Sequence, residues 1–257
     1  MSTPRKIALV TGAARGIGLA IANALLRDGH DVIGVDIDAD GIANTAQHVN
    51  ANQAAYLPQF VPLVADVAEA TAVTHLFAAV AAQFGGLDVL VNNAGTCFMN
   101  DFVDISPDEF RKQMAINFDS AFYCCQQAIP LLLKRQTSAP GIKKIINISS
   151  NGAYNFEVFD PAHYRASKAA LDTLTKHLAR RYAREGIAIN SIAPAMTRTD
   201  LFDVVPPDVL ERALSAMPRG KPIEPAEIAN WVAFLASPMG DCSSGNVIIL
   251  NQGRDVR

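Results

Sequence analysis

The sequence has no excess of positive charge. Its 257 residues include 22 lysines and arginines against 25 aspartates and glutamates, which gives a net charge of −3. We find no run of basic residues and no low-complexity tail. Proteins that bind nucleic acid or an anionic membrane through charge carry a basic patch, so the sequence predicts neither partner.

Long apolar runs and paired cysteines are also missing. The first apolar run, IALV at residues 7–10, is too short for the core of a signal peptide, and no stretch reaches membrane-spanning length. The four cysteines, Cys97, Cys124, Cys125 and Cys242, include no CxxC pair, and adjacent cysteines are geometrically poor disulfide partners. Free thiols suit a reducing compartment, so we expect a cytoplasmic protein.

Histidines with metal-ligand spacing are absent as well. The five histidines, at positions 30, 48, 75, 163 and 177, form no zinc-binding pattern, and we predict no metal site. His163 and His177 are expected to lie at the surface or in helix packing. What remains is a chain that is 50% apolar and 18% charged, which is typical of a globular protein with a large core.

Short apolar runs alternate along the chain with segments of helical periodicity. The apolar runs predict strands at 6–12, 30–38, 57–67, 87–95, 143–150, 186–194 and 246–253. Helices are predicted at 16–29, 71–85, 106–135 and 161–183, the last with Asp160 as its N-cap. Continuous apolar strands between helices indicate a parallel sheet covered on both faces. We therefore predict an α/β, Rossmann-like doubly wound fold in three layers, formed by a single domain over residues 1–257.

One segment interrupts this alternation. Residues 200–225 are rich in proline and only weakly helical, and they precede the last helix and strand. In doubly wound folds the ligand binds outside the carboxyl ends of the strands. We therefore expect this segment to overhang that edge of the sheet and to cover a substrate.

A glycine-rich loop follows the first predicted strand. It reads TGAARGIG, with glycines at Gly12, Gly16 and Gly18. Such a loop lets the backbone approach a pyrophosphate, and the helix that follows presents free N–H groups and its positive dipole end to the anion. The pattern is GxxxGxG, and its place between a strand and a helix favours nucleotide binding over an ordinary turn.

The second predicted strand ends in an acidic residue, Asp36. A carboxylate at this place can accept a hydrogen bond from a ribose 2′-hydroxyl and repels a 2′-phosphate, which favours NAD over NADP. Arg15 in the glycine loop argues the other way, because its guanidinium could meet a phosphate. We give the carboxylate more weight because it should lie directly on the ribose.

Further motifs follow in a fixed order. They are VADV with Asp66, NNAG at 92–95, AINF with Asn117, NISS ending at Ser150, YxxxK formed by Tyr164 and Lys168, and NSIAPAMTRT. With TGAARGIG, they resemble the short-chain dehydrogenases/reductases of the single-domain type over nearly the whole chain. Ala195 and Gln252 stand where that family commonly has glycine, and the spacing to Tyr164 leaves Ser149 and Ser150 both open, with Ser150 preferred.

The resemblance implies a set of site residues. The implied catalytic residues are Asn117, Ser150, Tyr164 and Lys168, with Asn117 holding a water and Lys168 also binding the nicotinamide ribose. The implied cofactor-binding residues are Gly12, Arg15, Gly16, Ile17, Gly18, Asp36, Asp66, Val67, Asn93, Ala94, Gly95, Tyr164, Lys168, Pro194, Thr197 and Thr199. From their places in the chain, the expected substrate residues are Cys97, Ser150, Asn151, Tyr154 and Phe202.

The Tyr164–Lys168 pair has a chemical reason for its spacing. Residues i and i+4 lie on one face of a helix. A free tyrosine has a pKa near 10, and a cation about 4 Å away contributes roughly 4 kcal/mol at an effective dielectric constant of 20. That is enough to bring the phenol into the range of a general base at neutral pH. Alone, such a pair is usually a solvated helix face, and the other motifs reverse that interpretation.

Three functions stay open from the sequence. The preferred one is an NAD-dependent dehydrogenase that interconverts a secondary alcohol and a ketone, with Tyr164 as general acid and base and a moderately apolar small-molecule substrate. The second is an NADP-dependent reductase of 3-oxoacyl thioesters. The third is a catalytically silent protein that senses nucleotides. The resemblance also implies a homotetramer, which light scattering can test.

Overall fold

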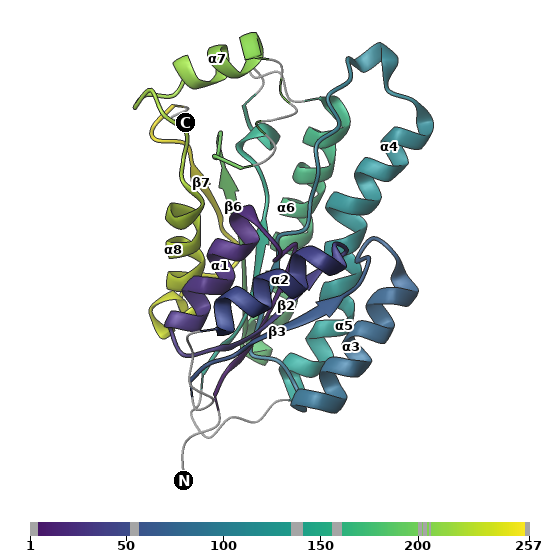
Figure 1. The fold of residues 1–257 in the computed structure, drawn as a ribbon, viewed down its shortest axis with the longest axis vertical. Coiled ribbons are helices and arrows are strands. Elements are labelled where there is room, and N and C mark those ends of the chain that lie inside the picture. The colour runs from purple at the N-terminus through teal and green to yellow at the C-terminus, as the bar shows by residue number, and fades with distance from the viewer. Residues whose placement is uncertain are drawn as a thin grey trace.

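The computed structural model describes residues 5–51, 57–134, 141–155, 161–199, 202, 205 and 207–254. Seven parallel strands form one sheet in the order β3-β2-β1-β4-β5-β6-β7. Figure 1 shows helices on both faces of this sheet. The predicted three-layer, doubly wound α/β fold is confirmed.

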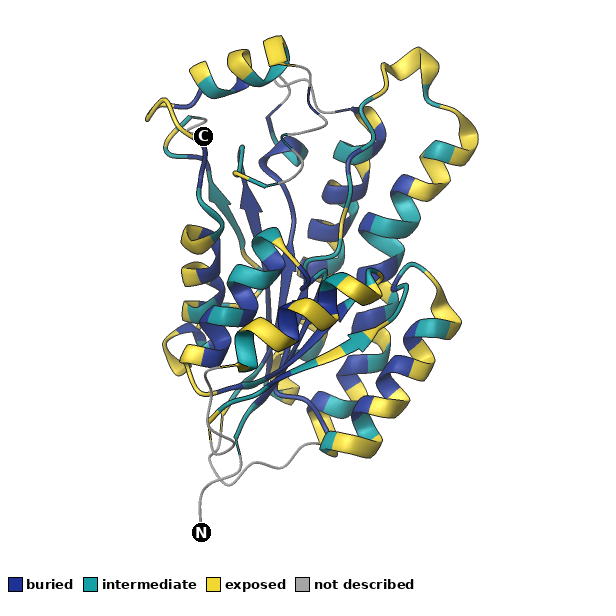
Figure 2. Cartoon of the chain, in the orientation of Figure 1, coloured by how far each residue is buried: buried dark blue, intermediate teal, exposed yellow. Residues whose placement is uncertain are grey.

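The strands occupy the predicted apolar runs. Their bounds are β1 Ile7–Thr11, β2 Asp31–Asp36, β3 Phe60–Val64, β4 Val89–Asn92, β5 Lys143–Ile148, β6 Ile187–Pro194 and β7 Val247–Leu250. The central strands are buried on both faces (Figure 2), which explains why their sequences are continuously apolar. Because all strands are parallel, their carboxyl ends lie along one edge of the sheet, and the loops that leave them meet there.

Six of the helices described pack against the sheet in two hydrophobic cores. Their bounds are α1 Gly16–Arg27, α2 Ala39–Asn50, α3 Ala70–Phe84, α4 Pro107–Met114, α5 Ser120–Lys134, α6 Ala162–Tyr182, α7 Pro207–Ser215 and α8 Pro225–Ala236. Short 3₁₀ turns occupy Phe102–Asp104, Asn151–Ala153, Ala183–Glu185 and Pro238–Gly240. Side chains of α1, α2 and α8 form one core, and those of α3, α5 and α6 form the other.

Several helices differ from the sequence prediction. Helix α2 was not predicted, although Asp38 caps it by accepting a hydrogen bond from the Gly41 backbone at 2.9 Å. The expected helix over 106–135 is divided by a π-helical segment, Ala115–Asp119, between α4 and α5. Helix α6 has Pro161 as its N-cap, one residue later than expected, and Asp160 lies outside the described residues.

The 200–225 segment contains helix α7. Figure 1 shows α7 beyond the carboxyl ends of β6 and β7, on the side of the sheet where we expected the overhang. Gln252 ties this segment to the chain terminus: its Oε1 accepts a hydrogen bond from the Arg219 backbone at 3.2 Å, and its Nε2 donates to the Lys221 carbonyl at 3.1 Å. Gln252 has a φ of 59°, a left-handed conformation that explains why glycine is common there in the family it resembles.

Candidate active site

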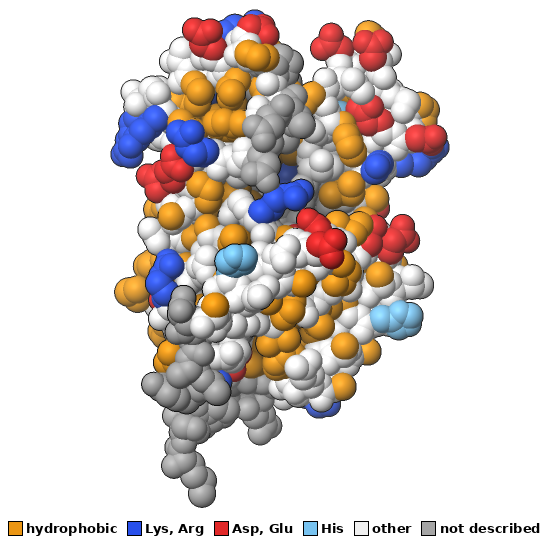
Figure 3. Space-filling view, in the orientation of Figure 1, with side chains coloured by type: hydrophobic (Ala, Val, Ile, Leu, Met, Phe, Trp, Pro, Cys, Tyr) orange, Lys and Arg blue, Asp and Glu red, His pale blue; other side chains and the backbone are white. Residues whose placement is uncertain are grey.

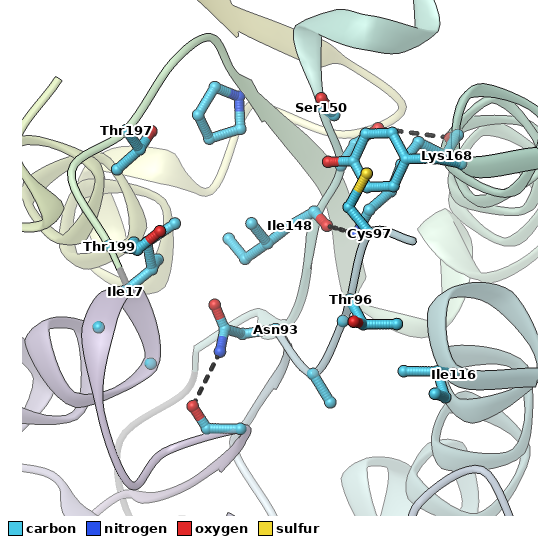
Figure 4. A pocket seen from close by; sticks show the side chains of 18 of the residues that line it. Ile17, Asn93, Thr96, Cys97, Ile116, Ile148, Ser150, Lys168, Thr197 and Thr199 are labelled. Carbon is cyan, nitrogen blue, oxygen red and sulfur yellow. Dashed lines mark hydrogen bonds between the residues drawn. The ribbon is translucent and has the colours of Figure 1, made fainter. Parts of the chain in front are cut away.

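A cavity of about 1100 Å³ lies where the loops after the strands meet. All sixteen predicted cofactor-binding residues line it, from Gly12 in the glycine loop to Thr199 after β6. Figure 4 shows Ile17, Thr197 and Thr199 on one side of this space and Ser150, Cys97 and Lys168 on the other. The fold therefore brings together segments that are far apart in the sequence.

The turn of the glycine loop depends on its glycines. Gly12 and Gly16 have φ values of 65° and 55°, which side chains rarely adopt. A Cβ on Gly18 would lie 1.9 Å from the carbonyl oxygen of Gly12, so no other residue fits there. Helix α1 begins at Gly16, and its first N–H groups are available to an anion at the cavity wall.

The NNAG motif braces this loop. Asn93 Nδ2 donates to the carbonyl oxygens of Thr11 at 2.9 Å and Gly12 at 3.1 Å. The Thr11 hydroxyl in turn accepts from the backbone N–H groups of Asn93 and Ala94, both at 3.0 Å. The Asn93 side chain therefore holds the ends of β1 and β4 together and fixes the shape of the glycine loop beside the cavity.

Two aspartates stand at the ends of neighbouring strands. Asp36 Oδ2 accepts from the Ala14 backbone at 3.0 Å, and its Oδ1 accepts from the Asp38 backbone at 3.1 Å. Asp66 Oδ1 accepts from the Ala68 backbone at 2.9 Å. These bonds orient both carboxylates at the cavity wall and leave each oxygen with further acceptor capacity.

Arg15 belongs to the same region but has an acidic neighbour. Its Nη1 lies 3.7 Å from Asp38 Oδ2, and its side chain is 69% exposed. Asp38 does not line the main cavity, whereas Arg15 and Asp36 do. The Asp36 carboxylate, held by two backbone donors, is therefore a fixed negative charge at this end of the cavity.

The two candidate serines have different surroundings. The Ser149 hydroxyl donates to Asp172 Oδ2 at 2.9 Å, so it is engaged with helix α6. The Ser150 oxygen accepts a hydrogen bond from the Gly152 backbone at 3.0 Å, which leaves its proton available for another acceptor. Both residues line the cavity, and the geometry favours Ser150 as the donor to a bound oxygen.

Tyr164 and Lys168 lie one turn apart on α6, and both line the cavity. Lys168 Nζ donates to the carbonyl oxygen of Ile148 at 2.9 Å. Burial lowers the pKa of Lys168 to about 8, although the charges of Asp172 and Cys97 act in the opposite direction. At pH 7 this lysine is still mainly an ammonium group, the form that supports a phenolate.

Asn117 lies close to Lys168, and its side chain is hydrogen-bonded to neighbouring segments. It lies in the π-helical segment, and its Oδ1 accepts from the Thr96 backbone at 2.8 Å. Its Nδ2 donates to the Thr96 carbonyl at 2.9 Å and to the Ser167 hydroxyl at 3.1 Å. Asn117 does not line the cavity, because its amide is used to join the segment after β4 to α6.

Four of the five expected substrate residues line the cavity, and one does not. Cys97, Ser150, Asn151 and Phe202 line the cavity. Tyr154 does not, because its hydroxyl donates to the buried carboxylate of Asp172 at 2.8 Å. The phenol is thus directed into the protein, which the position of Tyr154 after β5 did not reveal.

Three charged residues that the sequence did not indicate as site residues also line the cavity. Glu109 and Lys112 of α4 and Arg254 near the chain end all line it. The Lys112 ammonium lies 5.6 Å from the centre of the Phe98 ring, and Glu109 Oε1 is 3.0 Å from Nε2 of buried His163. Their spacing of three residues puts Glu109 and Lys112 on one helix face, but nothing in the sequence says where that face points.

The described residues contain no cluster of metal ligands and no helix suited to cross a membrane. No group of three or more His, Cys, Asp or Glu side chains is arranged to hold a metal ion there. None of the helices described is both long and apolar enough to cross a bilayer. On the face that Figure 3 presents, basic side chains are interspersed with acidic ones.

Comparison with known proteins identifies the family to which this chain belongs. The family model described as enoyl-(acyl carrier protein) reductase matches residues 12–255. The chain belongs to the short-chain dehydrogenase/reductase family. A 3-oxoacyl-(acyl-carrier-protein) reductase, FabG, of Staphylococcus aureus is 36% identical over 251 residues, covering 96% of this chain and 97% of that protein. A 2,3-dihydroxy-2,3-dihydro-p-cumate dehydrogenase of Pseudomonas putida is 32% identical over 251 residues, covering 96% and 93%.

A solved structure agrees with these relatives. The chain of the Pseudomonas aeruginosa RhlG/NADP active-site complex has a TM-score of 0.89 and 33% sequence identity, covering 97% of this chain and 96% of that one. Like its relatives in the short-chain dehydrogenase/reductase family, this protein is an oxidoreductase acting on CH–OH groups, and its cofactor is a nicotinamide nucleotide.

Proposed function

We propose that this protein is an NAD-dependent oxidoreductase that interconverts a secondary alcohol and a ketone. The observation that carries the choice of NAD is the Asp36 carboxylate, which lines the cavity at the end of β2 and is fixed by two backbone N–H groups. A carboxylate at this position accepts a hydrogen bond from a ribose 2′-hydroxyl and repels a 2′-phosphate.

The residues present fit a dinucleotide. Gly18 packs so closely on Gly12 and Asn93 that a Cβ there would displace the loop, and the first N–H groups of α1 lie beside residues that line the cavity, where they can bind a pyrophosphate. When bound, the nicotinamide accepts or supplies the hydride. The protein's contribution is to orient the two reactants and to control one proton.

That proton belongs to Tyr164 in the proposed mechanism. During oxidation the Tyr164 oxygen takes the proton of the substrate hydroxyl as the hydride leaves the same carbon, and during reduction Tyr164 returns a proton to the carbonyl oxygen. The Lys168 ammonium favours the phenolate form of Tyr164. The Ser150 hydroxyl, whose oxygen already accepts from Gly152, donates to the substrate oxygen and fixes its place.

A second candidate is an NADP-dependent reductase of 3-oxoacyl thioesters. Two observations favour it: the Staphylococcus aureus relative is a 3-oxoacyl-(acyl-carrier-protein) reductase, and the RhlG neighbour is a complex with NADP. Arg15 at the same end of the cavity could meet a 2′-phosphate. A nucleotide-sensing protein without catalysis is disfavoured, because Ser150, Tyr164 and Lys168 all face the cavity.

The cofactor is tested with a matched pair of variants. Wild-type protein should show a higher kcat/KM with NAD than with NADP. Asp36→Asn should raise kcat/KM for NADP by about 10- to 100-fold, because the repulsion of a 2′-phosphate is removed. Asp40→Asn makes the same charge change four residues away, at an exposed position that does not line the cavity, and should leave the ratio of the two kcat/KM values unchanged. Equal use of both cofactors by wild type, or a preference for NADP, would refute the NAD assignment.

The substrate class is tested by a panel. Secondary alcohols, polyols, hydroxysteroids, dihydrodiols and 3-hydroxyacyl thioesters would each be mixed with either cofactor, and the absorbance of the reduced nicotinamide would be followed. A thioester as the best substrate would favour the second candidate. Tight NAD binding without turnover on any of these would favour the nucleotide sensor.

A further inference from the structure

A buried carboxylate lies behind the Tyr164–Lys168 pair. Asp172 follows Lys168 by one helical turn, so the three side chains share a face of α6. Asp172 is 2% exposed and does not line the cavity. A charge removed from water in this way is costly unless it is paired, so its presence requires a physical reason.

The hydrogen bonds of Asp172 satisfy only one of its oxygens. The hydroxyls of Ser149 and Tyr154 both donate to Oδ2, at 2.9 and 2.8 Å. Burial raises the pKa of Asp172, and the hydroxyls of Tyr154, Ser191 on β6 and Ser149 act in the opposite direction. Oδ1 is buried and accepts no hydrogen bond from the described part of the chain. Hydroxyl groups alone therefore do not compensate this carboxylate.

A chain of buried side chains holds these donors in place. Ser191 Oγ lies 2.8 Å from Thr175 Oγ1, which accepts from Asn147 Nδ2 at 2.8 Å. Asn147 Oδ1 accepts from Asn92 Nδ2, also at 2.8 Å. This network joins β4, β5 and β6 to α6 beneath the cavity. Asp172 is thus attached to the rigid centre of the sheet rather than to a loop.

The buried cation one helical turn from Asp172 is Lys168. The lysine is 5% exposed, and its ammonium has the Ile148 carbonyl as a neutral acceptor. Burial lowers the pKa of Lys168, and among the influences that raise it Asp172 is the largest, followed by Cys97. The effect is mutual, because Lys168 also lowers the pKa of Asp172.

We propose that Asp172 is a positioning residue of this active site: its buried carboxylate, one helical turn beyond Lys168, keeps the Lys168 ammonium protonated beside Tyr164 and thereby sets the upper pH limit of catalysis. The inference rests on the proposed function for the part that concerns catalysis. The part that concerns the charge of Lys168 depends only on the two residues and their surroundings.

Tyr164, one turn before Lys168 on α6, faces the lysine in the wild type and in any Asp172 variant alike, and few other ionisable groups face this pair in the described residues. Tyr154, after β5, donates to Asp172, and Cys97, after β4, faces Lys168. His163, at the start of α6, is paired with Glu109 of α4 instead. Ser149 and Ser191 face Asp172 without titrating. Changes in the charge of Lys168 near neutral pH can therefore be assigned to Asp172 by substitution.

The decisive measurement is the pKa of Lys168 in Asp172→Asn. Asparagine keeps the size and polarity of the side chain but removes its charge. The titration would be followed by NMR of ¹³C-labelled lysine side chains, and the Lys168 signal would be identified by its absence in Lys168→Met. We expect the pKa to fall by about one unit or more, because a neighbouring opposite charge is lost. Glu185→Gln, in the 3₁₀ turn that follows α6, removes an exposed charge and should leave the pKa of Lys168 unchanged.

A kinetic measurement follows from the same variant. In the pH profile of kcat/KM with NAD and the best alcohol, the alkaline limb of Asp172→Asn should move to lower pH by the same amount, with little change at pH 6.5. A folded variant with an unchanged Lys168 pKa, or a shifted pKa without movement of the alkaline limb, would overturn the inference. Asp172→Ser replaces the first variant if the asparagine protein does not fold.

The two proposals fail in distinguishable ways. If the wild-type protein does not turn over any alcohol with NAD, the proposed function fails, and the NMR titration still decides whether Asp172 holds the charge of Lys168. If turnover is found and the titration shows no effect, the proposed function stands, and Asp172 is an anchor for Ser149 and Tyr154 only.

Discussion

The two sides of the cavity are built from different materials. On the glycine-loop side, defined by Gly12, residues 15–18, Asp36 and Asp66, the wall consists mainly of loop backbone and strand-end carboxylates, with the side chains of Arg15 and Ile17 beside them. On the α4 side, defined by residues 97–100, Glu109, Lys112, 150–152 and Phe202, it consists of larger side chains from separate segments. Backbone can be arranged by local sequence, whereas the second wall depends on how whole helices pack. The first side is therefore suited to a constant ligand and the second to a variable one.

The largest effect on activity should come from a substitution of Tyr164, which lies at the boundary between the two sides. Tyr164→Phe removes the proton acceptor but keeps the ring, so turnover should fall by roughly 10³-fold or more. NAD affinity, measured by calorimetry, should change only a few-fold, since the glycine-loop side is untouched. Tyr182→Phe, at the end of the same helix, is the matched control and should keep full turnover. Substantial turnover in Tyr164→Phe would mean that another group carries the proton.

The next largest effect concerns the backbone of the glycine-loop side. In Gly18→Ala the new Cβ would meet the Gly12 carbonyl oxygen at 1.9 Å and Asn93 Nδ2 at 2.6 Å. Relief of this overlap must displace the loop, at a cost of about 1–3 kcal/mol in the free energy of unfolding. NAD affinity should drop together with stability, which urea unfolding and calorimetry would measure.

Gly141→Ala provides the control for this substitution. A Cβ at Gly141 would meet nothing within 4 Å, and its backbone is not left-handed. Stability and NAD affinity should therefore stay within experimental error of wild type. Equal behaviour of the two alanine variants would show that the close approach at Gly18 does not shape the cofactor site.

The contrast between the two sides also explains what the sequence could predict. The strands and the glycine loop were readable because buried parallel strands are continuously apolar and because a tight turn demands glycine. Helix α2 was missed although Asp38, Ile42 and Ala46 carried the signal: a cap followed by buried residues four apart. Its polar outer face concealed that pattern.

Other features could not be read from local sequence. The π-helical segment turns Asn117 toward the backbone of Thr96. Such a segment adds one residue to a helical turn, and the local sequence does not predict where this happens. Tyr154 was expected at the substrate because it follows β5, yet a partner on α6 redirects its hydroxyl. That partner, Asp172, looks like an ordinary helical aspartate until the sheet is packed against it.

The smallest effect should come from the α4 side. Lys112 is exposed at the cavity wall, and its ammonium lies over the Phe98 ring. An exposed cation–π contact contributes about 0.5–1 kcal/mol, so Lys112→Ala should change the KM of the alcohol substrate only about two- to fivefold. The KM for NAD should not change, because Lys112 belongs to the wall opposite the glycine loop. Steady-state kinetics with each substrate varied in turn would separate the two constants.

Lys176→Ala is the control, since it removes an exposed lysine from α6 outside the cavity wall. It should leave both KM values unchanged. A Lys112→Ala effect on the KM for NAD as large as that on the alcohol would contradict the division of the cavity into two sides. A rise of a hundredfold or more in the KM of the alcohol alone would strengthen the division into two sides. Lys112 would then bind an anionic group of the substrate directly. The panel of alcohols could be narrowed to those that carry such a group.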